Sequence, residues 1–128
     1  MTPTVKAAFA YVLPVFAAAF LLGALRVTLI APRLGALAAV ALEIPLVLAI
    51  SWGCAGRVLR RWQLTTVPRA VMGSLAFAIL MVLELLTALA FGQSPTLFLA
   101  AMTTPPGALG LAGQIGFGLI PFLRQPRG

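Results

Sequence analysis

Acidic residues are scarce in this chain, and two residue types with common chemical roles are missing. Its 128 residues include no histidine, one cysteine and two acidic residues, against nine lysines and arginines. Both acids are glutamates. A chain without histidine and aspartate lacks the usual groups for most metal sites and for most acid–base catalysis. We therefore expect a protein that is not an enzyme and holds no metal or cofactor.

Charge of either sign is also rare. Charged residues make up 9% of the chain and hydrophobic residues 62%, whereas a soluble domain has about 25% charged residues. So few charges cannot cover a water-facing surface, so the lipid bilayer is the expected surrounding. The basic residues flank apolar runs, as the positive-inside rule describes, and we expect no nucleic-acid partner.

Four apolar runs are long enough to approach the ~20 residues that a membrane-crossing helix needs. They cover residues 7–29, 34–54, 70–91 and 107–123. Only helices satisfy their backbone hydrogen bonds within single segments of this kind. The sequence predicts an all-α membrane protein, with residues 1–128 forming one domain of four transmembrane helices in an antiparallel bundle.

The distribution of lysine and arginine predicts the orientation. The N-terminus, the second loop and the C-terminal tail carry one, four and two basic residues. The first loop carries at most two, Arg26 and Arg33, and the third loop carries none. The more basic side faces the cytoplasm, so we expect both termini there. Within the third loop, Ser94 and Pro95 predict the start of a short helix over 96–102.

Both glutamates lie inside apolar runs, which is the most informative feature of the sequence. Glu43 lies in the second run and Glu84 in the third. With the predicted topology, each is about 10–13 Å from the outer boundary at ~1.5 Å per residue. Gln114 in the fourth run reaches a similar depth, and Arg26 lies near the outer end of the first. Ionised groups in lipid are costly, so we expect a polar cluster of Arg26, Glu43, Glu84 and Gln114 inside the bundle.

Two further residues are secondary candidates for this cluster. Arg33 is the second choice as a basic partner for the acids, and Thr87 shares a helix face with Glu84. The protonation state of the two glutamates stays open.

Small residues mark the faces on which these helices are expected to pack. Gly73 shares the face of Glu84, and Gly118 shares the face of Gln114. Small residues let membrane helices approach closely. We expect packing at the glycines of the fourth run, including contact with a second copy of the chain: Gly107, Gly110, Gly113 and Gly116.

Prolines inside the runs predict unpaired carbonyl groups. Pro14, Pro45 and Pro121 each lack the N–H that the carbonyl four residues earlier would accept, and each can bend its helix.

Two functions remain open from these patterns. In the first, the chain is a structural or accessory membrane protein, and the polar cluster joins its helices. In the second, it is a small channel or a proton- or cation-coupled transporter that uses the two glutamates, because acids inside a membrane often mark such pathways. The expected partners are the lipid bilayer and either a second copy of the chain or a larger membrane complex.

Three stretches carry a resemblance to other proteins. They are GALRVTLIAPRLGALAAVALEIPLVLAISW, RAVMGSLAFAILMVLEL and TPPGALGLAGQIGFGLIPFL. Together they resemble a group of small four-helix bacterial membrane proteins that has no assigned activity. The resemblance implies a multi-pass protein of the bacterial inner (cytoplasmic) membrane and adds no activity.

Overall fold

The computed structural model describes residues 2–124, and every regular element in that range is helical. In chain order the elements are α1 (Pro3–Leu25), a π-helix (Arg26–Ile30), α2 (Ala31–Leu34), α3 (Ala36–Trp62), α4 (Thr66–Ala90), α5 (Pro95–Ala101) and α6 (Pro105–Leu123). Four helical segments are long and apolar enough to cross a membrane: residues 3–34, α3, α4 and α6. The prediction of an all-α protein with four such helices is confirmed.

Three of the helices begin with the same local arrangement. Thr2, Ser94 and Thr104 each accept a hydrogen bond from the backbone N–H three residues further on. A proline follows each of them. Proline suits the first helical position because its missing N–H would have no partner there. The short helix predicted in the third loop is confirmed as α5, with Ser94 as its cap.

The helices continue beyond the apolar runs. The second run was expected to end near Cys54, but α3 extends to Trp62 and takes in the first arginines of the second loop. At the other end of α3, the chain stays helical up to Leu34 and turns at Gly35, where φ is +89°. Glycine adopts this conformation without the steric cost that a side chain would bring.

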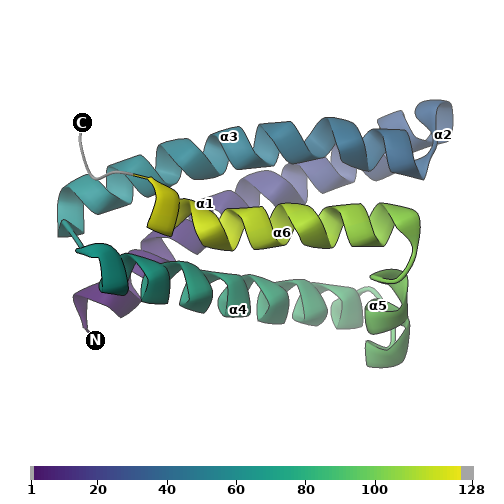
Figure 1. The fold of residues 1–128 in the computed structure, drawn as a ribbon. Coiled ribbons are helices and arrows are strands. Elements are labelled where there is room, and N and C mark those ends of the chain that lie inside the picture. Colours follow the sequence, from purple (N-terminus) through teal and green to yellow (C-terminus); the bar gives the residue numbers. More distant parts are fainter. Residues whose placement is uncertain (1, 125–128) are drawn as a thin grey trace.

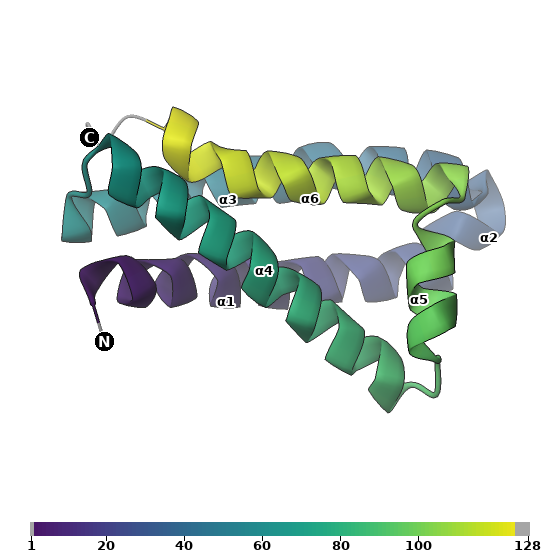
Figure 2. The same cartoon turned by 60° about the horizontal axis from the view of Figure 1, so that its bottom comes forward.

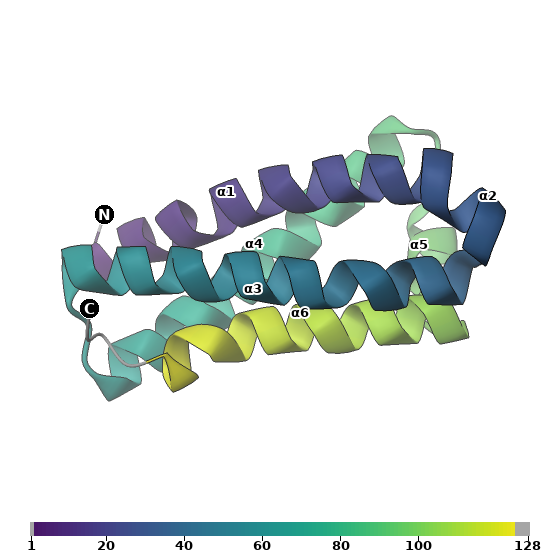
Figure 3. The ribbon, with the colours of Figure 1, turned by 90° about the horizontal axis from the view of Figure 1, so that it is seen from above.

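The four long helices form a ring (Figures 1 and 3). Helix α1 packs against α3 and α4, and α6 packs against the same two helices. The start of α1 and the end of α6 lie at one end, called the terminal end below, and α2 and α5 lie at the opposite, loop end. Figure 2 shows α4 crossing α1 and diverging from α6 towards the loop end, where α5 runs across from α4 to α6.

Buried side chains gather in the half of the ring near the terminal end. They include Ala7, Ala8, Tyr11, Val12, Ala55, Leu59, Met72, Ala76, Phe117 and Ile120. Lipid is as apolar as these side chains, so close packing has to hold them together in a membrane. The closest approach is between α4 and α6, where a Cβ added to Gly73 would overlap the carbonyl oxygen of Gly118. This contact confirms that these two glycines lie on packing faces.

Candidate functional site

A cavity of about 440 Å³ occupies the half of the ring near the loop end. All four long helices and α5 contribute to its lining. The four residues of the predicted polar cluster all border it: Arg26, Glu43, Glu84 and Gln114. The structure thus brings together side chains that lie up to 88 positions apart in the sequence, from 26 to 114. Their role as a functional site stays a prediction.

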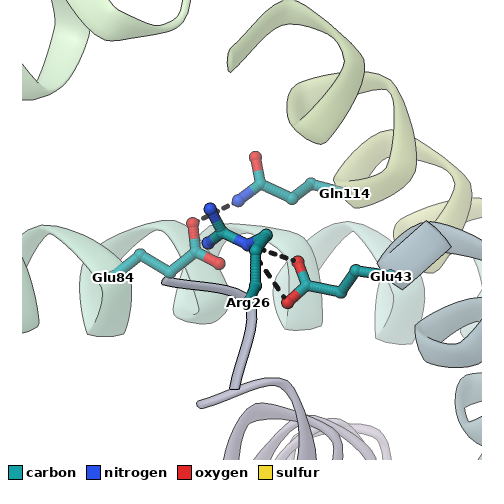
Figure 4. Close-up of polar contacts among 4 residues, drawn as sticks. All are labelled: Arg26, Glu43, Glu84 and Gln114. Atoms are coloured by element: carbon teal, nitrogen blue, oxygen red, sulfur yellow. Dashed lines mark hydrogen bonds and ion pairs between the residues drawn. The ribbon is translucent and has the colours of Figure 1, made fainter. Parts of the chain in front are cut away.

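Arg26 and Glu43 form an ion pair across the first hairpin (Figure 4). The Nε atom of Arg26 lies 3.4 Å from Oε2 of Glu43 and 3.5 Å from Oε1. The side chains are 30% and 18% exposed, so the pair is partly shielded from the surroundings. Arg26 begins the π-helix, in which the Ala31 N–H donates to the Arg26 carbonyl five residues back. Such wide turns are often found at functional sites.

Glu84 and Gln114 form the second polar contact and join α4 to α6. The Nε2 group of Gln114 donates a hydrogen bond to Oε2 of Glu84. Figure 4 shows the amide oxygen of Gln114 turned away from Glu84. The same view draws the guanidinium group of Arg26 between the two carboxyl groups, so the two contacts form one cluster.

The cluster carries an uneven charge. With both carboxyl groups ionised, Glu43 and Glu84 contribute two negative charges and Arg26 contributes one positive charge. One negative charge is therefore left over, and it has no basic partner among the residues that line the cavity. Arg26 already pairs with Glu43. The arrangement suits the binding of one proton or one monovalent cation at Glu84.

Phe117 separates the cavity from the packed half of the ring. It lines the cavity on one side and stacks on Tyr11 on the other, with ring centroids 4.5 Å apart. Neither residue belonged to the predicted site. Pro121 was the available signal, because it lies four residues after Phe117 and leaves that carbonyl without its usual donor. The Tyr11 hydroxyl donates to this carbonyl instead.

Helix α5 covers part of the cavity at the loop end. Phe98 and Ala101 of α5 contribute to the lining, as does Met102, which follows the helix. Helix α5 lies so close to the start of α6 that a Cβ on Gly107 would overlap the carbonyl oxygen of Ala101. Gln93, in the connection before α5, adds a second amide side chain to the lining.

The two secondary candidates do not reach the cavity. Arg33 is exposed on α2. The hydroxyl group of Thr87 donates to the carbonyl of Leu83 in its own helix. A short hydroxyl side chain commonly bonds its own helix in this way, so sharing a face with Glu84 did not bring Thr87 into the cluster.

The glycines of α6 pack within the chain, with one exception. A Cβ on Gly113 would lie 3.2 Å from Ile44, and one on Gly116 would lie 3.2 Å from Leu48. These two positions serve the contact with α3, and the structure shows them as an internal packing face. Gly110 was also predicted to pack, but no atom lies within 4 Å of its added Cβ, because this position faces the cavity.

Comparison of the chain with protein-family models, with curated proteins and with solved structures gives no match. The resemblance to small bacterial membrane proteins therefore stays a prediction.

Proposed function

We propose that this chain is an integral protein of the bacterial inner membrane, with four membrane-spanning helices in an antiparallel bundle and both termini in the cytoplasm. The length and composition of the four long helices support the first part. The basic residues of the second loop support the orientation, since positive charge favours the cytoplasmic side. Of the two tail arginines, Arg124 ends the described chain and Arg127 lies outside the described residues.

We further propose that the cavity binds a proton or a monovalent cation and that the protein works in transport. One observation carries this proposal: Glu43 and Glu84 both border an open space. If these polar groups only joined helices, we would expect them to lie in a closely packed region. The half of the ring near the terminal end is packed in this way, but its buried residues are mostly apolar. The geometry thus favours the transporter over the structural or accessory role.

The remaining half of the ring is closed by side chains. Tyr11, Leu59, Met72 and Phe117 are the largest fully buried residues there. A path across the membrane would therefore need a rearrangement of these helices or a second copy of the chain. We propose a homodimer or a larger membrane complex as the working form.

Ion flux in liposomes tests the transport proposal. Purified chain is reconstituted, a membrane potential is imposed, and internal pH and sodium are followed with dyes. We expect flux in the wild type and its loss in Glu84→Gln, which keeps the shape and removes the charge. Thr87→Val is the matched control, because Thr87 lies on the same helix and does not border the cavity.

Thermal unfolding of the same samples in detergent separates the two functions. A folded wild type without flux, together with a Glu43→Gln and Glu84→Gln double variant that no longer folds, would support the structural role instead.

A further inference from the structure

We propose that the ligand of the cavity is a small organic monocation, an ammonium group attached to an apolar body. This inference rests on the proposed function and specifies its substrate class. It goes beyond a proton or an inorganic ion, and it follows from three features of the lining: charge, hydrogen-bonding groups and apolar surface.

The charge of the lining selects a single positive charge. Arg26 neutralises Glu43, and Glu84 receives only the neutral amide of Gln114. With both carboxyl groups ionised the cluster has one net negative charge, so an anion would be repelled. A divalent metal ion would need more ligands, and the described residues contain no group of three or more acidic, cysteine or histidine side chains placed to hold one.

The hydrogen-bonding groups suit an ammonium better than a bare sodium ion. An ammonium group donates three hydrogen bonds. Besides Glu43, which pairs with Arg26, the lining residues whose side chains carry acceptor oxygens include Glu84, Gln93 and Gln114. A small inorganic ion would also have to replace its water shell on sides where the lining is apolar, and apolar side chains offer no oxygen ligands.

The rest of the lining suits an apolar body. Val40, Ile44, Leu80, Phe98 and Leu111 are among the residues that border the space. A volume of about 440 Å³ lies within the range of pockets that enclose small organic molecules, roughly 300–1,000 Å³. An amine with an aromatic or branched apolar group would place its charge at Glu84 and its body against these side chains.

Binding to the full chain in lipid nanodiscs tests the ligand class, with empty nanodiscs measured for lipid partitioning. The probe is 4-phenylbutylammonium, compared with the neutral 4-phenylbutanol and the anion 4-phenylbutyrate. We expect saturable binding of the ammonium, at least about tenfold weaker binding of the alcohol, and no displacement by sodium at equal concentration. The tenfold figure corresponds to the loss of one charge-assisted hydrogen bond.

Two variants locate the site. Glu84→Gln should weaken binding of the ammonium probe at least about tenfold, because it removes the same charge-assisted hydrogen bond. Gly110→Leu should block the ammonium without altering any charge, because this position borders the cavity and a side chain there has open space. Gly53→Leu is the matched control, since a Cβ on Gly53 also meets nothing within 4 Å and Gly53 does not line the cavity.

Equal binding of the alcohol and the ammonium by the wild type would overturn the inference, and this comparison does not depend on any variant folding. Full binding by folded Gly110→Leu or displacement by sodium would overturn it as well. Glu84-dependent proton or sodium flux without ammonium binding would leave the transport proposal standing and remove only the ligand class. Ammonium binding without any flux would leave the ligand class standing and remove the transport proposal.

Discussion

The hydroxyl group of Tyr11 supplies the hydrogen bond that Pro121 removes from Phe117. Its oxygen lies 2.6 Å from the Phe117 carbonyl oxygen, and the two rings stack with 4° between their planes. Pro121 has no N–H for the carbonyl four residues earlier. In an apolar interior that carbonyl has no water to bind, so α1 completes the hydrogen bonding of α6.

This relationship predicts a non-additive pair of mutations. Tyr11→Phe keeps the stacked ring and removes the donor, so it should lower the free energy of unfolding by about 0.5–2 kcal/mol, the range for hydrogen bonds between membrane helices. In a Pro121→Ala background the backbone N–H of residue 121 can serve the carbonyl. In that background Tyr11→Phe should lower the free energy of unfolding by clearly less than it does in the wild type. Unfolding in mixed micelles measures all four proteins, and strictly additive costs would contradict the assignment.

Close contact between α4 and α6 gives a second prediction. Gly73→Ala should separate the two helices, because its Cβ would overlap the backbone carbonyl of Gly118, and backbone cannot move aside as a flexible side chain can. We expect a loss of more than about 1 kcal/mol, typical of overpacking. Gly53→Ala is the control, since its Cβ meets nothing within 4 Å. Should the two alanine variants unfold alike, the helices are not in contact at Gly73.

Much of the fold and the membership of the polar cluster could be predicted because few polar residues interrupt long apolar runs. Glu43, Glu84 and Gln114 stand out in such runs, and the length of the runs fixes their depth. Packing was harder to predict. Gly110 and Gly113 look alike in sequence and both border the cavity, yet only Gly113 contacts α3. Their different surroundings depend on how helices cross, which the spacing of small residues does not specify.

The π-helix and the Tyr11–Phe117 contact also lay beyond the sequence analysis. A π-helix adds one residue to a turn without a distinctive residue pattern, so the wide turn at Arg26 was not predicted, although Arg26 itself was expected in the polar cluster. The partner of a proline-freed carbonyl comes from another helix, and no local signal identifies it. Pro121 predicted that a donor was needed but not which residue would supply it.

The ion pair of Arg26 and Glu43 predicts a compensating double variant. Arg26→Gln should lower stability by on the order of 1 kcal/mol, because the pair is only partly exposed and its loss leaves a carboxylate facing the cavity without a basic partner. Adding Glu43→Gln should restore most of that loss, since two amides can still hydrogen-bond. Thermal unfolding of the two single variants and the double variant tests this. A double variant less stable than both single variants would mean that the two charges act separately.

A fourth prediction concerns Arg124 at the terminal end, where its guanidinium carbon lies 5.0 Å from the ring centre of Trp52. Gly56 makes room for this contact, because a Cβ there would lie 2.5 Å from Nη2 and 2.9 Å from Nε of Arg124. Gly56→Val should therefore displace the guanidinium from the indole ring. A cation held over an aromatic ring is attracted to it by about 0.5–1 kcal/mol at exposed sites, so the loss of stability should be small.

The readout is the environment of Trp52, measured by fluorescence in a Trp62→Phe background so that one indole remains. The emission of Gly56→Val and its quenching by iodide should match those of Arg124→Gln. Adding Arg124→Gln to the Gly56→Val protein should then change neither signal further. Gly53→Val is the control, because it lies next to Trp52 in sequence but a Cβ there meets no atom within 4 Å. An unchanged indole signal in Gly56→Val would show that the arginine reaches the ring by another route.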